Sequence, residues 1–417
     1  MSNRQSSIVN RQCSSVEEIR AQFPALRRRV GAHEVAYFDG PGGTQVPEIV
    51  GQAMLDYLYH HNANTHWAYP TSVETDQLIE DARAAVGDLL FCRPEQVVFG
   101  QNMTTLTFHL ARGLGRRFDK GDILVITDLD HHANRAPWET LVAERGVTIR
   151  SVRFDRRSGE LDWKGLDRAL EGRVRLLAIG AASNALGTIT DVGAVCRMAR
   201  ERGVLSFVDA VHFAPHQLVD VKQIACDFLA CSPYKFYGPH LGVMWGRGVL
   251  LEEVPVPKLE PAPDAVPERL ESGTLSHEAI VGTRAAVDFL AGIAPGRASR
   301  REALEHAYAE LHRRSAPQFE RLWSGLRALP GVRVYGPPPD RDRTPTLAFT
   351  VEGKTSKAVA RELATAGLFL SHGDFYAATV VQRLKVEGLV RAGCACYTTN
   401  EEVERLIEAV RELSINH

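Results

Sequence analysis

Residues 204–239 read VLSFVDAVHFAPHQLVDVKQIACDFLACSPYKFYGP and contain two short apolar runs, at 204–210 and 228–232. Both runs are rich in residues that favour β-strands, and each ends in polar side chains. Similar runs recur along the chain and alternate with segments that have the periodicity of helices. Strands that are apolar throughout and separated by helices indicate a mostly parallel sheet covered on both faces. We therefore predict an α/β fold with a ligand site at the carboxyl ends of its strands.

The alternation of strands and helices covers most of the chain. Strands are expected at 97–99, 123–127, 148–154, 174–180, 204–210, 228–232 and 242–245, with helices between them at 103–114, 133–144 and 191–202. The proline-rich stretch 254–267 cannot continue a helix or a central strand, so we expect it to form an excursion on the surface.

A second, smaller unit of α+β character follows this excursion. Helical patterns at 277–293 and 299–329 precede a strand, a helix, a strand and a helix at 346–351, 356–365, 389–397 and 400–413. The polar N-terminal region carries a short helical pattern at 16–23. We expect three parts: an arm of residues 1–35 that joins the small domain, a large cofactor-binding domain of residues 36–294, and a small C-terminal domain of residues 295–417.

The composition excludes several classes of protein. The 417 residues include 49 Lys and Arg against 51 Asp and Glu, so a net charge of −2 gives no general attraction to nucleic acid or to an anionic membrane. No run approaches the roughly 18 apolar residues of a membrane helix, and the N-terminus lacks the apolar core of a secretion signal. The seven cysteines are scattered without a disulfide framework. We expect a cytoplasmic protein with neither a nucleic-acid nor a membrane partner.

Lys235 follows the apolar run 228–232 and lies between aromatic residues, Pro and Gly. A buried position there would favour the neutral amine, which is a nucleophile. Asp209 ends the neighbouring strand and could face the same crevice. A lysine that forms a Schiff base and a carboxylate that keeps a pyridine nitrogen protonated are the groups that pyridoxal phosphate chemistry requires. A purely structural ion pair between Lys235 and Asp209 is the alternative.

Two other strand ends carry groups that suit the same cofactor. Thr104 and Thr105 come after the strand at 97–99 and open a helix, whose N–H groups and hydroxyls can bind a phosphate. His131 follows the strand at 123–127 and offers an imidazole that could stack on an aromatic ring. Each feature alone is common in loops and helix caps. The prediction therefore depends on their combination.

Five motifs together give the chain a resemblance to a known family. They are Asp209-Ala-Val-His212, Ser232-Pro-Tyr-Lys235-Phe-Tyr-Gly-Pro239, His131-His132-Ala-Asn134, Ser183-Asn184-Ala-Leu-Gly-Thr188 and Glu271-Ser-Gly273-Thr274. With them the chain resembles the class V aminotransferases, and most of all the branch of the cysteine desulfurases and selenocysteine lyases, over about residues 37–413. The resemblance implies a fold-type I enzyme that binds pyridoxal 5′-phosphate, acts on an amino acid, and forms a homodimer with both active sites at the subunit interface.

The resemblance also implies a role for each matching residue. Lys235 matches the Schiff-base lysine, Asp209 the partner of the pyridine nitrogen and His131 the imidazole stacked on the ring, so these three are the expected catalytic residues. The further expected cofactor contacts are Thr104, Thr105, Asn184, His212, Ser232, Tyr234 and Thr274, the last of which reaches the phosphate of the partner subunit.

The resemblance also concerns positions expected near the substrate. His212 stands where many relatives have glutamine, and Tyr234 replaces the usual histidine. Arg391 matches the arginine that binds the substrate α-carboxylate, a task for which a bidentate guanidinium is well suited. Asn64 and His66 are expected in the substrate pocket.

One departure from the family pattern concerns cysteine. Desulfurases carry their nucleophilic cysteine shortly before the substrate arginine, and the segment 371–378 here reads SHGDFYAA. Cys394 and Cys396 follow Arg391 on the same expected strand, where alternation places them on the opposite face, so we expect both to be small core residues. Their spacing with His372 matches no common zinc pattern, so no metal site is expected.

The missing cysteine decides between functions. Persulfide chemistry needs a thiolate that attacks the substrate sulfur. We therefore predict a lyase that eliminates a sulfur group from Cβ of a cysteine-like amino acid, through a Schiff base with the cofactor. A class V aminotransferase, a cysteine desulfurase with an atypical sulfur acceptor and an epimerase are open alternatives. A non-catalytic relative is disfavoured because all of the expected catalytic residues are present.

Overall fold

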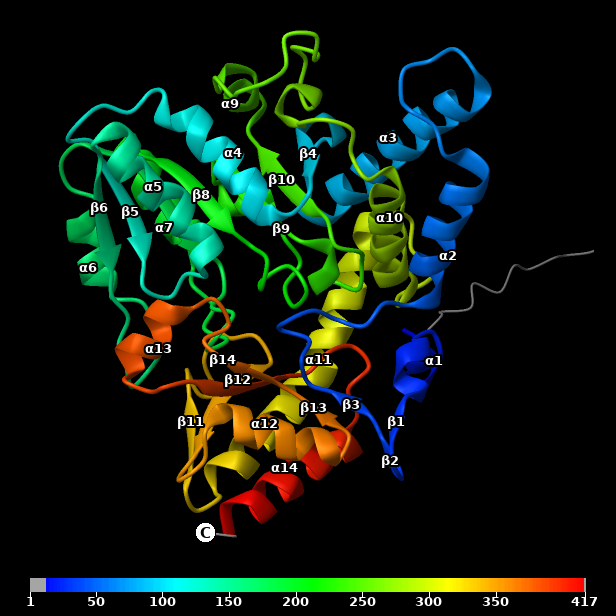
Figure 1. The fold of residues 1–417 in the computed structure, drawn as a ribbon, viewed down its shortest axis with the longest axis vertical. Coiled ribbons are helices and arrows are strands. Elements are labelled where there is room, and N and C mark those ends of the chain that lie inside the picture. The colour runs from blue at the N-terminus through cyan, green and yellow to red at the C-terminus, as the bar shows by residue number, and fades with distance from the viewer. Residues whose placement is uncertain (1–12, 416–417) are drawn as a thin grey trace, which may run out of the picture.

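A seven-stranded sheet forms the centre of the computed structural model, which describes residues 13–415 (Figure 1). The strands are β4 (Val97–Gly100), β5 (Ile123–Thr127), β6 (Thr148–Val152), β7 (Val174–Gly180), β8 (Leu205–Asp209), β9 (Phe228–Cys231) and β10 (Gly242–Gly246). Their order is β4-β10-β9-β8-β7-β5-β6. Strand β10 is antiparallel to both neighbours, and β9, β8, β7, β5 and β6 are parallel. The predicted, mostly parallel sheet is confirmed.

Helices cover both faces of this sheet, and alternate residues of a strand face opposite layers. On β7, Leu176 and Ala178 pack with α4 (Met103–Gly115) and α5 (Ala136–Arg145). Leu177 and Ile179 belong to the other core. That core includes residues of α3 (Pro70–Leu90), α6 (Trp163–Ala169), α7 (Val192–Glu201) and α10 (His277–Gly292). Because both faces are buried, inner strands such as β5 and β9 have no polar side, which explains their continuous apolar sequences, whereas the edge strand β6 keeps polar residues.

A second, antiparallel sheet follows in the chain. Its strands are β11 (Val332–Tyr335), β12 (Thr346–Val351), β15 (Leu389–Gly393) and β14 (Ser371–Gly373), in the order β11-β12-β15-β14. Its core contains residues of α12 (Ser356–Thr365), α14 (Asn400–Ile415) and the long helix α11 (Arg300–Arg327). Figure 1 shows α11 running from the seven-stranded sheet to the smaller one. The remaining short helices are α2 (Glu48–Asp56), α8 (Val221–Ile224), α9 (Gly248–Glu253) and α13 (Ala378–Leu384).

The N-terminal segment contributes strands to two further sheets of two strands each. Helix α1 (Val16–Ala21) begins with a capping box of Ser15 and Glu18. Strand β3 (Ala36–Tyr37) pairs in parallel with β13 (Leu368–Phe369), and a small hairpin of β1 (Arg29–Val30) and β2 (His33–Glu34) precedes it. The part of the expected arm at residues 1–12 lies outside the described residues. The domain boundaries at 35/36 and 294/295 stay a prediction.

Some expected elements differ from the structure. The predicted strand 389–397 ends at Gly393, because its partner β12 begins at Thr346 and the preceding Pro345 has no N–H for the ladder. The predicted surface excursion is wrong for its first residues, because Val254 and Val256 are buried against α4. Helix α3 is not among the elements predicted from the sequence. Among residues 13–415, none of the helices has both the length and the apolar character needed to span a bilayer.

A buried ion pair fixes α3 to the sheet and to the segment after the excursion. Arg83 on α3 makes two hydrogen bonds to Glu271, at 2.8 and 2.9 Å, and the Phe99 amide donates to the same carboxylate at 2.7 Å. Both ionised side chains are almost completely buried. Removal of one partner would leave an uncompensated charge in the interior.

We therefore expect Glu271→Ala to lower the free energy of unfolding by about 3–5 kcal/mol, measured by urea titration. Glu404→Ala is the matched control, because its pair with Arg321 is exposed and should contribute less than about 1 kcal/mol. Equal effects of the two substitutions would contradict the structural role of the buried pair.

Candidate active site

A cavity lies at the carboxyl ends of β4, β5, β7, β8 and β9. Eight of the residues predicted from the sequence line it: Thr104, His131, Asn184, Asp209, His212, Ser232, Tyr234 and Lys235. They come from five separate connections of the chain. The parallel strands bring them together because their carboxyl ends meet at one edge of the sheet.

Lys235 is in a short 3-10 turn that follows β9, and its side chain is buried. Its Nζ donates to the carbonyl oxygens of Pro41 and Gly42, at 2.6 and 2.9 Å. Burial and the nearby Arg391 guanidinium lower the pKa of Lys235 to about 7. A large fraction of the amine is therefore unprotonated near neutral pH, as a nucleophile requires. The carbonyls of residues 41 and 42 follow β3 some 190 residues earlier in the chain, and no local sequence pattern predicts their contact with Lys235.

Asp209 is the last residue of β8 and lies on the floor of the cavity. The Val211 amide donates to its Oδ1 at 2.9 Å. Burial, together with the smaller effect of the Asp130 carboxyl, raises the pKa of Asp209 to about 7, although the Val211 amide opposes this shift. A buried carboxylate of this kind is stabilised by a cationic N–H, such as that of a protonated pyridine.

Three more side chains leave hydrogen-bonding or stacking capacity in the cavity. His131 Nδ1 accepts from the Ala133 amide at 3.0 Å, and burial lowers the pKa of His131 to about 4, so its imidazole is neutral. Asn184 Nδ2 donates to the Phe375 carbonyl at 2.9 Å, and His212 Nε2 lies 3.1 Å from Thr344 Oγ1. Within residues 13–415, Asn184 Oδ1 and His212 Nδ1 are buried without a hydrogen-bond partner. Such orphaned atoms fit a bound polar ring.

The two neighbouring threonines of α4 have different roles. Thr104 lines the cavity. Thr105 is engaged in the helix cap, because its amide donates to Asn102 Oδ1 and its hydroxyl donates to the Asn102 carbonyl, both at 2.9 Å. Gly242 on β10 passes so close to Asn102 that a Cβ there would collide with the Asn102 backbone. The start of α4 is thereby fixed beside Ser232, and together they can cradle a phosphate.

Arg391 is buried on β15, next to the cavity. It donates to the Asn184 carbonyl at 2.8 Å and to Ser371 Oγ at 3.3 Å. Its guanidinium lies 4.2 Å from the centre of the Phe375 ring. The carboxyl group of Asp39 lies near the Arg391 guanidinium, and burial raises the pKa of Asp39 to about 6. Asp39 is not among the site residues predicted from the sequence. Arg391 is therefore placed to bind a carboxylate beside the Lys235 cavity.

The segment between β14 and α13 crosses the site. Phe375 and Tyr376 both have a φ of 56°, in the left-handed region that bulky residues avoid. The Tyr376 carbonyl accepts from the His132 amide at 2.7 Å, and the Tyr376 ring lies 5.6 Å from the His131 ring. These contacts hold an aromatic segment at residues 371–378, the position at which the resemblance to desulfurases would place a nucleophilic cysteine.

Three predicted residues are not brought to this cavity. Asn64, His66 and Thr274 line a different cavity of the same chain. His66 Nε2 lies 3.1 Å from Glu268 there. Their assignment to the active site therefore depends on a second copy of the chain and stays a prediction.

The model of the family described as aminotransferase class-V matches residues 36–406. The chain belongs to the class V aminotransferase family. A probable cysteine desulfurase of Xylella fastidiosa is 31% identical over 416 residues, which cover 94% of each chain.

Solved structures of the family agree in fold. The apo structure of a cysteine desulfurase from Thermococcus onnurineus is 27% identical, with a TM-score of 0.88 over 97% of this chain and 100% of that chain. A cysteine desulfurase from Escherichia coli is 26% identical, with a TM-score of 0.84 over 97% and 99% of the two chains. The predicted fold-type I architecture is confirmed, and the chain is a pyridoxal 5′-phosphate-dependent enzyme.

Replacement of Asp209 tests the effect of its burial. The raised pKa means that the folded state binds the proton more tightly, so the unfolding free energy of the cofactor-free chain falls as the pH rises from about 4 to about 7. Asp209→Asn removes this ionisation. We expect the variant to be more stable by roughly 4 kcal/mol at pH 8, with a difference that nearly vanishes at pH 4. The exposed Asp264→Asn is the control in denaturant titrations, and a pH-independent difference for Asp209→Asn would contradict the assignment.

Covalent attachment of the cofactor tests Lys235 directly. After borohydride reduction, we expect peptide mass spectrometry to find the cofactor mass on Lys235 in the parent enzyme. Lys235→Ala should carry none, whereas replacement of the exposed Lys164 should change nothing. Retention of a reducible cofactor in Lys235→Ala would overturn the assignment.

Proposed function

We propose that this enzyme is a lyase that cleaves the Cβ–S bond of a cysteine-like amino acid, consumes one water molecule and releases a thiol, pyruvate and ammonia. The observation that carries the proposal is the aromatic segment that crosses the site, where Phe375 and Tyr376 lie and segment 371–378 contains no cysteine. Sequence relatives named cysteine desulfurases support a sulfur-containing amino acid as the substrate.

Each side chain of the cavity has a part in such a reaction. When bound, the cofactor supplies an electron sink for the carbanion that forms at Cα. Arg391 holds the substrate α-carboxylate, Lys235 takes the Cα proton, and Asp209 holds the proton on the ring nitrogen. The buried, neutral imidazole of His131 packs against the ring. The sulfur group then leaves from Cβ as a thiolate, without attack by a protein nucleophile.

The thiols nearest to Arg391 in the sequence are poorly suited to accept sulfur. Cys394 packs in the core of the small sheet, and burial raises the pKa of its thiol to about 12. Burial also raises the pKa of Cys396 to about 12. Since the thiolate is the reactive form, neither residue is an efficient nucleophile at neutral pH. A desulfurase with another sulfur acceptor, an aminotransferase and an epimerase use the same Cα–H abstraction and are the alternatives.

The remaining features of the proposal concern assembly. We place the enzyme in the cytoplasm as a homodimer, with Asn64, His66 and Thr274 completing the cavity of the partner subunit. Residues 36–294 would form the cofactor-binding domain, and residues 1–35 and 295–417 the smaller one. Cross-linking of two copies through these three residues would be the direct support for the shared site.

Substrate turnover separates the candidate reactions. We expect the purified holoenzyme to release pyruvate and a thiol in equal amounts from S-substituted cysteines, measured with lactate dehydrogenase and a thiol reagent. Conversion of the cofactor to pyridoxamine phosphate without pyruvate would indicate an aminotransferase instead. Formation of alanine and sulfide from free cysteine, lost in Cys394→Ala or Cys396→Ala, would indicate a desulfurase.

A further inference from the structure

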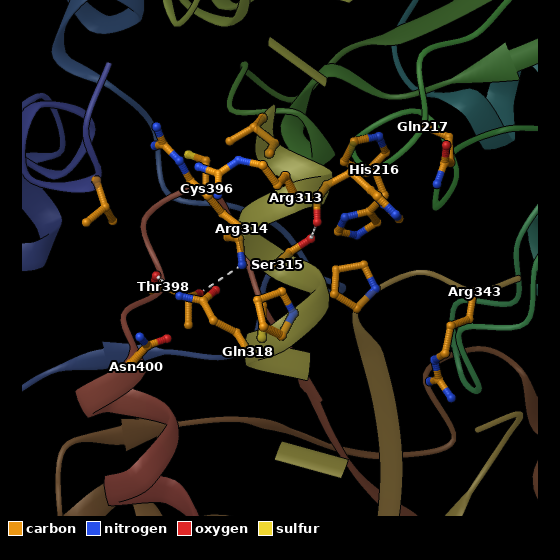
Figure 2. Close-up of a pocket in the computed structure, with 18 of the residues that line it drawn as sticks. His216, Gln217, Arg313, Arg314, Ser315, Gln318, Arg343, Cys396, Thr398 and Asn400 are labelled. Carbon is orange, nitrogen blue, oxygen red and sulfur yellow. Dashed lines mark hydrogen bonds between the residues drawn. The ribbon is translucent and has the colours of Figure 1, made fainter. Parts of the chain in front are cut away.

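A second cavity, of about 430 Å³, lies where α11 passes between the two sheets. Its walls come from six segments: the start of α1, the connection after β8, Tyr237 after β9, the middle of α11, the residues before β12 and the chain after β15. Figure 2 shows this cavity with His216, Gln217, Arg313, Arg314, Ser315, Gln318, Arg343, Cys396, Thr398 and Asn400 labelled around it. It shares none of its lining residues with the Lys235 cavity.

A proline in α11 contributes to the polarity of this cavity. Pro317 lies inside the helix and has no N–H, so the Arg313 carbonyl lacks its helical hydrogen bond. Both residues line the cavity. Close to them, Gln318 Nε2 donates to the Thr398 carbonyl at 3.0 Å and links α11 to the chain after β15. The residue with the free backbone carbonyl and the residue with the linking amide side chain therefore line the same cavity.

The charge of the lining is positive. Three arginines line the cavity, and no Asp or Glu is among the described residues that do so. Two histidines line it as well, but burial lowers the pKa of His216 to about 4, so that ring adds no charge near pH 7. One carboxylate serves two of the arginines: Glu310 lies 2.7 Å from Arg313 Nη2 and 2.6 Å from Arg314 Nε. Within residues 13–415, Arg314 Nη1 is buried without a hydrogen-bond partner. The Arg313 side chain is exposed to water, whereas a charge left in excess at the largely buried Arg314 is costly unless a ligand compensates it.

Arg343 adds a guanidinium that no carboxylate neutralises in the described part of the chain. It is 8% exposed and lies over the rings of Phe319 and Trp323, at 4.1 and 4.8 Å. Its hydrogen bonds go to backbone carbonyls, including that of Leu186 at 3.2 Å, and its Nη1 has no partner there. Burial lowers the pKa of Arg343 to about 9.

We propose that this cavity is a second small-molecule site, which takes a compact anion with a carboxylate or phosphate group. Guanidinium groups bind such oxyanions in bidentate geometry. The neutral donors Ser315 and Gln217 are positioned to hydrogen-bond the rest of the ligand. Because the walls come from both sheets and from α11, a bound anion stabilises the arrangement of these parts.

The site is also adjacent to active-site elements. His216 lines it, and the His216 ring lies 5.4 Å from the ring of His212 in the Lys235 cavity. The chain after β15 lines it directly after Arg391. Occupancy of the second site can therefore be transmitted to the groups that hold substrate and cofactor.

Calorimetry on the holoenzyme tests the proposal, with inorganic phosphate and malonate as separate probes in a low-salt chloride buffer. We expect saturable binding of at least one probe, at about one site per chain and below about 10 mM, and a higher thermal midpoint. Tighter binding of malonate would assign a carboxylate ligand, and tighter binding of phosphate a phosphorylated one. Absence of saturable binding by both probes would overturn the proposal.

Three variants locate the binding. Ser315→Glu places a carboxylate in the cavity and should abolish binding, while Arg313→Gln should weaken it at least about tenfold. Arg321→Gln, on the exposed side of the same helix and paired with Glu404, should bind as the parent does. Circular dichroism checks the fold of each variant, and Arg313→Gln alone decides if Ser315→Glu does not fold. Parent-like binding in Arg313→Gln would place the anion elsewhere and overturn the proposal.

Discussion

Burial of ionisable groups at one edge of the seven-stranded sheet is the constraint on which the site depends. Lys235 and Asp209 lie out of water at the ends of adjacent parallel strands, and both pKa values move toward neutrality for that reason. Arg391 and Asp39 are buried beside them and partly offset each other. The interior thus holds groups that can gain or lose a proton near pH 7, and the same burial makes the cofactor-free site expensive in folding free energy.

The sequence predicted the central sheet and most of the cavity, because these features are local. Strands such as β8 and β9 are continuous apolar runs that end in functional residues, and parallel pairing then brings the ends together. The patterns also predicted two strands of the small sheet, β12 and β15, and its helices α11, α12 and α14, but not the short strands β11 and β14. Helix α3 was not predicted, because many charged residues interrupt the apolar residues along it.

Other features could not be read from local patterns. The Pro41 carbonyl accepts a hydrogen bond from Lys235, which is 194 residues away in the sequence, and no motif predicts this contact. Adjacent threonines look equivalent in sequence, but the Asn102 cap engages Thr105 and leaves Thr104 to the cavity. Thr274 lies in a separate cavity of the chain. Its predicted role is a contact with the phosphate of a partner subunit, so that role cannot be seen within one chain.

The pairing of β3 with β13 determines when the active site can form during synthesis. The backbone that caps Lys235 follows β3 directly, and β3 is hydrogen-bonded to a strand near residue 368, while the Phe38 carbonyl accepts from the Gly393 amide at 2.9 Å. The seven strands of the large sheet leave the ribosome before these partners. A nascent chain can therefore assemble the sheet early, but it completes the backbone around the lysine pocket only after nearly all of the polypeptide has emerged.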